Sequence, residues 1–201
     1  SFPTRRSSDL VCMRLCSIQD NRFAYRKNVL PTSMHPSQAA LIVSLAKPYL
    51  KETAQIMDPF CGVGTLLIER AHLVPAREIY ATDTYGDAIT MGRENAALAK
   101  TRINFIHRDF FDFRHDYKFD ELITDMPVRN RQTKAEMELF YERFFDKASE
   151  HLVSGGIIVM YSNEIGFVKK QIRLRVEYRL LQETCILDKK DFYLFVIRYE
   201  D

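Results

Sequence analysis

The chain has 201 residues, of which 46% are hydrophobic and 28% charged, and this is enough for one globular domain with a sizeable core. Its formal net charge of +2 permits a polyanionic partner without requiring one, so any affinity for nucleic acid must come from local patches. The sequence has no run of about eighteen apolar residues and no signal-like apolar segment near its start. We therefore expect no membrane-spanning helix and no membrane partner, and the sequence favours a cytoplasmic protein.

The cysteines give no sign of a metal site. Cys12, Cys16, Cys61 and Cys185 lack paired C-x-x-C spacing, and no histidines are set out around them as in zinc sites. We therefore expect reduced thiols and no bound metal. Cys61 is interpreted as a small buried packing residue and not as a nucleophile.

The first ten residues, SFPTRRSSDL, match at every position the translation of a common sequencing-adapter oligonucleotide in one frame. Residues 1–10 are accordingly interpreted as a non-native segment, with the natural protein beginning upstream of Val11. Residues 11–30 show no clear helical or strand periodicity of apolar residues, and we expect them to connect to a missing upstream region. Residues 31–201 are predicted to form the folded domain.

The elements of that domain alternate between helix and strand. The turn-rich stretch 31–36 precedes a helix that begins near Pro36, where a missing N–H costs nothing, and stops by Pro48. The pattern then predicts strands at 54–58, 78–83, 103–107, 119–124 and 157–161, with helices at 65–71, 86–100, 134–152 and 165–172. Gly155 and Gly156 are expected to separate the long helix from the fifth strand. Segments 176–187 and 192–199 read as an antiparallel hairpin.

The stretch Asp58-Pro59-Phe60-Cys61-Gly62-Val63-Gly64-Thr65 joins the first strand to the next helix. Glycines in such a turn let the backbone approach a ligand closely, which is typical of a nucleotide-type site. A dinucleotide fingerprint would need a third glycine at position 67, where this chain has Leu67. The stretch therefore favours a nucleotide-like ligand other than a nicotinamide or flavin dinucleotide.

Acidic residues follow four successive strands: Asp58, Asp83, Asp109 and Asp125. Ligands of an open α/β sheet bind at the carboxyl ends of its strands, so these acids are expected at one edge. Asp83 lies about twenty residues after the glycine turn, where a carboxylate can accept from both hydroxyls of a ribose.

The pattern D-P-F-C-G-V-G-T resembles motif I of class I S-adenosylmethionine-dependent methyltransferases, and the nearest family is the THUMP-associated RNA guanine-N2 methyltransferases. The elements Tyr25-Arg26, His35-Pro36 and Ala39-Ala40 resemble motif X of that family, and the likeness extends to Tyr199. The resemblance implies a doubly wound, Rossmann-like α/β sheet of strand order 3-2-1-4-5-7-6 that ends in the antiparallel hairpin. It also implies S-adenosyl-L-methionine as cofactor.

The resemblance assigns roles at the cofactor site. Asp58 would act at the methionine end, Asp83 at the ribose, and Asp109 at the adenine amino group with the next backbone N–H on a ring nitrogen. The residues expected to bind the cofactor are Asp58, Phe60, Cys61, Gly62, Gly64, Thr65, Asp83, Thr84, Asp109 and Phe110.

The segment Asp125-Met126-Pro127-Val128 resembles motif IV, [D/N]-P-P-aromatic, of the amino-methylating families. The guanine amine is a poor nucleophile, so we predict that the Asp125 carboxylate and the Met126 carbonyl hold its hydrogens, while Pro127 fixes the turn. Met126 in place of proline should loosen this turn. Val128 replaces the aromatic residue that stacks on a flipped base, and Val128, Arg129 and Arg131 are the expected substrate-binding residues.

These features predict an RNA methyltransferase that acts on the exocyclic N2 of a guanosine in tRNA or rRNA, with RNA bound through the upstream region. One alternative is an amino methyltransferase for DNA adenine, protein glutamine or a small molecule, which would share motif IV chemistry. Another is a non-catalytic cofactor-binding or RNA-binding module that keeps only the fold. Cofactor binding without methyl transfer to any RNA would favour the second alternative.

Overall fold

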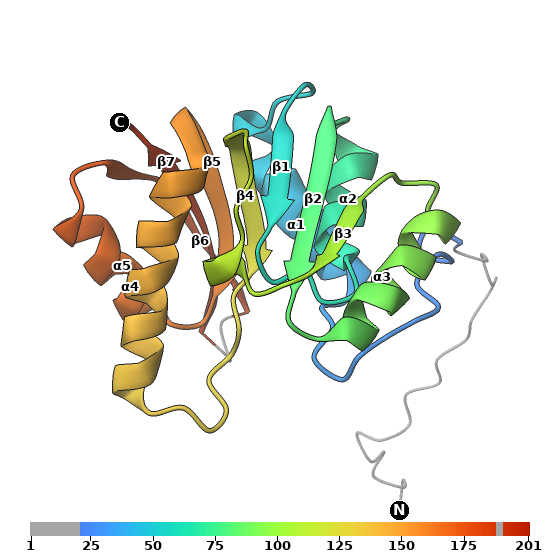
Figure 1. Cartoon of the computed structure of the whole chain (residues 1–201), viewed down its shortest axis with the longest axis horizontal. Helices are drawn as coiled ribbons and strands as arrows, with labels where there is room; N and C mark the ends of the chain where they lie inside the picture. The colour runs from blue at the N-terminus through green and yellow to red at the C-terminus, as the bar shows by residue number, and fades with distance from the viewer. Residues whose placement is uncertain (1–20, 188–190) are drawn as a thin grey trace, which may run out of the picture.

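In the computed structural model, the described residues are 21–187 and 191–201. They form a seven-stranded sheet of order β3-β2-β1-β4-β5-β7-β6 (Figure 1). The strands are β1 (Gln55–Asp58), β2 (Glu78–Asp83), β3 (Asn104–His107), β4 (Phe119–Asp125), β5 (Leu152–Ser162), β6 (Tyr178–Leu187) and β7 (Phe192–Tyr199). Strand β7 is antiparallel to both β5 and β6, and the other pairs are parallel. The predicted fold class and strand order are confirmed.

Helices cover both faces of this sheet (Figure 1). They are α1 (Pro36–Ala46), α2 (Thr65–Leu73), α3 (Gly86–Leu98), α4 (Lys134–His151) and α5 (Ile165–Leu174), with short 3-10 turns η1 (Lys47–Tyr49) and η2 (Phe110–Asp112). Neighbouring strand residues point to opposite faces, so Ile56 joins the core under α1, α2 and α3, whereas Met57 joins the core under α4 and α5. Two apolar cores therefore hold the central strands in place.

The helix boundaries follow from local chemistry. Helix α1 begins with Pro36, and the His35 side chain caps it by accepting from the Ser37 backbone N–H. Helix α4 begins with a reciprocal capping box, in which Thr133 and Glu136 each bind the other's backbone N–H. These starts agree with the prediction from the sequence.

The expected position of Gly155 and Gly156 was wrong. Both lie inside β5, which begins at Leu152, and not in a turn before it. Leu152 pairs with Phe119, and the register shifts before Ile157 pairs with Glu121. Gly155 has a φ of +78°, which L side chains rarely adopt. The two glycines thus form an irregularity within the strand, of the kind that a β-bulge produces.

Part of the expected connector packs on the domain. Tyr25 is buried, and its hydroxyl donates to Glu69 of α2 over 2.5 Å. The division of the chain at residue 30 stays a prediction. The expected non-native segment 1–10, Cys12 and Cys16 lie outside the described residues. Over the two described ranges, no helix is long and apolar enough to cross a membrane.

Candidate active site

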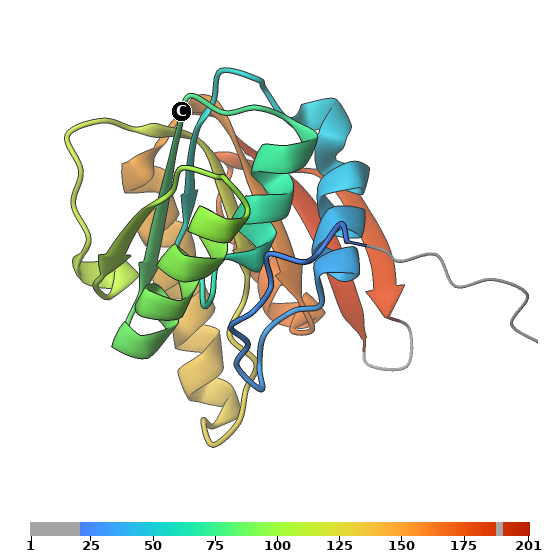
Figure 2. The same cartoon turned by 90° about the vertical axis from the view of Figure 1, so that its right-hand side faces the viewer.

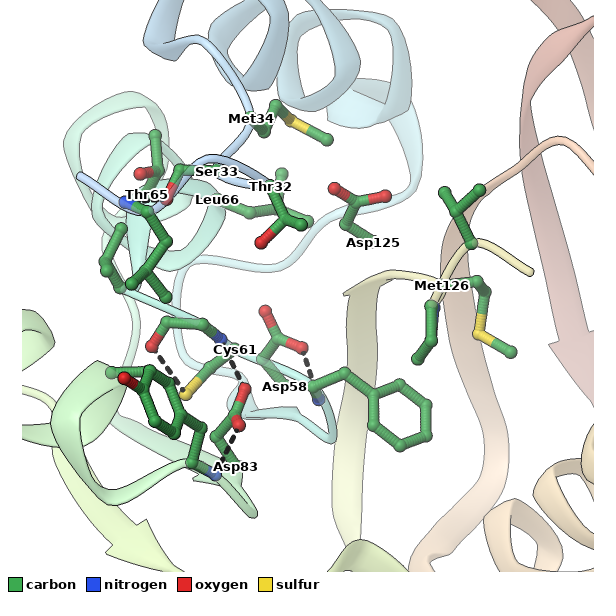
Figure 3. Close-up of a pocket in the computed structure, with 18 of the residues that line it drawn as sticks. Thr32, Ser33, Met34, Asp58, Cys61, Thr65, Leu66, Asp83, Asp125 and Met126 are labelled. Carbon is green, nitrogen blue, oxygen red and sulfur yellow. Dashed lines mark hydrogen bonds between the residues drawn. The ribbon is translucent and has the colours of Figure 1, made fainter. Parts of the chain in front are cut away.

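A cavity of about 390 Å³ lies at the carboxyl ends of β1, β2 and β4, a volume typical of small-molecule sites (Figure 3). Its walls come from the segment before α1, the turn between β1 and α2 with the start of α2, the end of β2 with the start of α3, and the end of β4 with the loop after it. The lining residues are Leu30, Thr32, Ser33, Met34, Asp58, Phe60, Cys61, Gly62, Val63, Thr65, Leu66, Asp83, Tyr85, Ala88, Asp125, Met126, Pro127, Val128 and Asn130.

Asp58 is the last residue of β1 and is buried at the floor of the cavity. Its Oδ1 accepts a hydrogen bond from the Phe60 backbone N–H over 3.0 Å. Burial raises the pKa of this carboxyl to about 8, although the hydrogen bond from Phe60 opposes the shift and the charges of Asp125 and Asp83 add to it. A ligand cation next to Asp58 would favour its ionised form.

The two glycines of the turn have different functions. A Cβ at Gly64, where φ is +78°, would lie 2.8 Å from the Phe105 ring, so this glycine is needed for close packing of α2. Gly62 has a φ of +50°, and a Cβ there would meet no atom within 4 Å. Gly62 lines the cavity and Gly64 does not.

Asp83, at the end of β2, ties the turn to the sheet (Figure 3). Its Oδ2 accepts from the Gly62 N–H and its Oδ1 from the Tyr85 N–H, each over 2.8 Å. An ionised carboxylate has about four lone-pair sites, so each oxygen can still accept from a ligand hydroxyl. The Asp83 carboxylate is therefore oriented by the backbone while it remains able to bind.

Thr65, a residue of the cavity wall, has a buried hydroxyl. The residue is only 4% exposed, it lines the cavity, and its Oγ1 has no hydrogen-bond partner among the described residues. Buried polar atoms are nearly always paired, so this unpaired hydroxyl is an exception beside the cavity.

Asp125 is the last residue of β4, and burial raises the pKa of its carboxyl to about 7. The expectation that Met126 loosens the following turn stays a prediction, but one contact of Met126 opposes it. The Met126 backbone N–H, which proline would lack, donates to the Tyr161 carbonyl over 2.9 Å, and the Met126 side chain is buried. Val128 lines the cavity and is 51% exposed, so it lies at the rim.

Six of the predicted site residues do not line the cavity: Gly64, Thr84, Asp109, Phe110, Arg129 and Arg131. Asp109 caps η2 by accepting from the Phe111 N–H over 2.9 Å, and Phe110 is buried in the apolar core. Arg129 is partly exposed and lies 3.7 Å from a Glu164 carboxylate oxygen. Their assigned roles at cofactor or substrate stay predictions.

Cys61 agrees with its interpretation as a packing residue. It is a free thiol at the cavity wall, buried within the core beneath α2, and burial raises its pKa well above the usual range. A thiol that stays protonated is a poor nucleophile. The other described cysteine, Cys185, is free and exposed.

Sequence reasoning missed part of the wall. The residues concerned are Leu30, Thr32, Ser33, Met34, Val63, Leu66, Tyr85, Ala88 and Asn130. The stretch 30–34 could have been recognised as a candidate, because it is a turn-rich segment with hydroxyl side chains directly before the first helix. Its position over the cavity depends on tertiary packing that no local pattern reports.

Comparisons with known proteins agree with this geometry. The model of the RMKL-like methyltransferase domain family, UPF0020, matches residues 24–184. The tRNA (guanine(10)-N2)-dimethyltransferase of Methanothermobacter thermautotrophicus is 32% identical over 157 residues, which cover 75% of this chain and 46% of that protein. The release factor glutamine methyltransferase of Lactococcus lactis is 25% identical over 155 residues, which cover 68% of this chain and 56% of that protein.

Solved structures show the same fold. The crystal structure of TrmN from Thermus thermophilus matches with a TM-score of 0.73 at 22% identity, covering 89% of this chain and 52% of that one. The present chain thus spans about half the length of the relatives it matches.

The donor set of the cavity fits S-adenosylmethionine. Asp83 can still accept from ribose hydroxyls, and the carboxyl groups of Asp58 and Asp125 line the same cavity, where they would balance the positive charge of the cofactor. Together with the family match over most of its length, this shows that the chain belongs to the RMKL-like methyltransferase domain family and is an S-adenosylmethionine-dependent methyltransferase.

Proposed function

We propose that this protein transfers the methyl group of S-adenosylmethionine to the exocyclic N2 of a guanosine in RNA, in either tRNA or rRNA. The observation that carries the proposal is the position of Asp125, whose carboxyl lines the same cavity as Asp58 and Asp83. The 32% identical relative, named as a tRNA guanine-N2 dimethyltransferase, supports the choice of acceptor.

Asp125 and the turn after it would orient the amine. The lone pair of the guanine amine is delocalised into the ring, so the site must hold the nitrogen in line with the methyl group. The Asp125 carboxylate can accept one N–H and the Met126 carbonyl the other. The bound cofactor supplies an electrophilic methyl group on its sulfonium. Because Met126 is tied to Tyr161 and followed by Pro127, the backbone at this point is held in place.

The loop after β4 supplies cations beside this turn. Asn130 lines the cavity, and Arg129 and Arg131 on either side of it are exposed. Phosphate contacts from such residues would set the register of an RNA without reading its sequence. With the RNA backbone held by these arginines, the base would enter the cavity past Val128, which lies at its rim.

A second candidate acceptor is a protein glutamine. The relative that is 25% identical is named as a release factor glutamine methyltransferase, and a glutamine amide poses the same chemical problem, because its lone pair is also delocalised. The two acceptors differ in the polymer that carries the amine, so a direct assay separates them.

The test is single-turnover transfer from labelled S-adenosylmethionine, followed by nucleoside mass spectrometry. Unmodified tRNA and rRNA transcripts should yield N2-methylguanosine, and the same transcripts made with inosine, which lacks the exocyclic amine, should yield none. Methylation of a glutamine-containing protein with no RNA product would replace the proposal by the second candidate. Methylation of inosine transcripts at an unchanged rate would show that another atom is the acceptor.

A further inference from the structure

The cavity has one wall that comes from the N-terminal side of the fold. We call residues 26–34 the N-terminal strap. It contributes Leu30, Thr32, Ser33 and Met34 to the lining. Figure 1 shows this segment (blue) at the end of the sheet to which the strand arrows point, and Figure 2 shows it running beside α1 and α3. In Figure 3, Thr32 and Met34 lie on the side of the cavity near Asp125.

A buried asparagine of α3 holds this strap. Asn95 is 0% exposed, and its Nδ2 donates to the Asn28 carbonyl over 2.9 Å. The Asn28 backbone N–H donates in return to Asn95 Oδ1 over 3.0 Å. A side-chain amide carries the same donor and acceptor as a backbone group, so Asn95 satisfies both polar groups of Asn28 as a neighbouring strand would. Asn95 itself does not line the cavity.

Other hydrogen bonds of the strap contribute less to its attachment. Leu30 and Ser33 bind each other, and the Arg26 guanidinium donates to the Met34 carbonyl over 3.2 Å, so these bonds shape the strap without fixing it to the domain. The Asn28 side chain donates to Glu94 over 2.7 Å, but this contact is exposed to competing water. Among the described residues, the Asn95 amide is thus the buried polar link between the strap and the helices of the domain.

We propose that Asn95 is a positioning residue for the methyl-transfer site, which acts through the strap on cofactor binding. The orientation of groups at a site depends on the residues that hold them, even where those residues do not touch the ligand. If the strap is released, only part of the population has a complete cavity, and the apparent affinity falls by that fraction. This inference depends on the cofactor alone and is independent of which acceptor is methylated.

The test measures S-adenosylmethionine binding by calorimetry, without any methyl acceptor. Asn95→Ala should weaken binding by about tenfold, the scale of two lost hydrogen bonds. Asn95→Ser keeps one hydrogen-bonding group and disturbs the packing less, so its affinity for S-adenosylmethionine should lie between those of Asn95→Ala and wild type. Hydrogen exchange should show faster exchange of the Asn28 amide, while the amides of β1 keep their protection.

Two matched variants separate positioning from general destabilisation. Asn28→Ala removes only the exposed contact to Glu94, because Asn95 binds the Asn28 backbone, and it should leave affinity unchanged. Ile79→Ala opens the core at the amino end of β2, away from the cavity, and should lower the melting temperature with little effect on affinity. The proposal is overturned if Asn95→Ala and Asn95→Ser bind within twofold of wild type, or if Ile79→Ala at an equal loss of melting temperature weakens binding equally.

Discussion

At the scale of single residues, the chemistry of this protein depends on carboxyl groups that the fold withdraws from water. Burial raises the pKa of Asp125 to about 7 and that of Asp58 to about 8. Ionising either group inside the cavity costs free energy unless a cation is present. The positively charged cofactor can supply that cation, so we expect cofactor binding and ionisation of these groups to favour each other.

Two substitutions of Asp125, Asp125→Asn for stability and Asp125→Ala for activity, test the role of its carboxyl. A carboxyl whose pKa is higher in the folded than in the unfolded chain stabilises the fold below its unfolded value of about 3.9, and this stabilisation is lost as pH rises toward about 7. Asp125→Asn should therefore gain in melting temperature relative to wild type as pH increases from 5 to 8. The single-turnover transfer rate of Asp125→Ala, which removes the acceptor altogether, should fall by roughly a hundredfold to a thousandfold, the scale for one positioned transition-state hydrogen bond.

Thermal unfolding at several pH values, with single-turnover assays at pH 8, checks both parts. A melting-temperature difference that does not change with pH would contradict the raised pKa. A transfer rate that survives Asp125→Ala would show that Asp125 does not hold the amine.

At the scale of elements, a buried ion pair holds α2 against β4 below the cavity. Arg70 and Glu121 are both buried, and Nε of Arg70 donates to Oε2 of Glu121 over 2.9 Å. The same guanidinium donates to the Lys51 carbonyl over 3.0 Å and to the Val74 carbonyl. Because Thr65 at the other end of α2 lines the cavity, this pair helps to fix the helix that forms part of the cavity wall.

Arg70→Ala should destabilise the fold by about 3–5 kcal/mol, because it leaves Glu121 buried without its partner. The double variant Arg70→Met with Glu121→Leu should recover most of that loss, since paired apolar side chains of similar volume need no charge compensation. Denaturant unfolding of the single and double variants measures both. If the double variant is no more stable than Arg70→Ala, the cost comes from lost packing and not from the unpaired carboxylate.

At the scale of the whole molecule, a net charge of +2 provides little general attraction for RNA. The chain also spans only about half the length of the relatives it matches. We therefore expect residues 11–201 to bind structured RNA weakly, in the range of about 10⁻⁴ to 10⁻⁶ M typical of non-specific contacts, while they bind cofactor normally. Fluorescence anisotropy with a labelled tRNA at 50 and 200 mM salt measures this. Nanomolar affinity at physiological salt would show that the chain itself carries the main RNA-binding surface.

Local patterns in the sequence determined the helices and strands of this protein, whereas the strand order followed from the family resemblance. The alternation of helical and strand periods, Pro36 at a helix start and the glycine turn after β1 depend on neighbouring residues, so they were predicted within a few positions of their observed bounds. The acids at the strand ends followed from the same reasoning, because strand ends meet at one edge of a parallel sheet. The glycines of β5 were misplaced because their irregularity depends on pairing with β4.

Only the tertiary structure decided which residues form the cavity and how they are held. The strap reaches its position through Asn95, 67 residues away from Asn28 in sequence, and Arg70 pairs with Glu121 across 51 residues. The raised pKa values of Asp58 and Asp125 come from burial, which depends on packing by several elements at once. Such contacts leave no periodic trace in the chain, because their partners are brought together only when the sheet and its helices have formed.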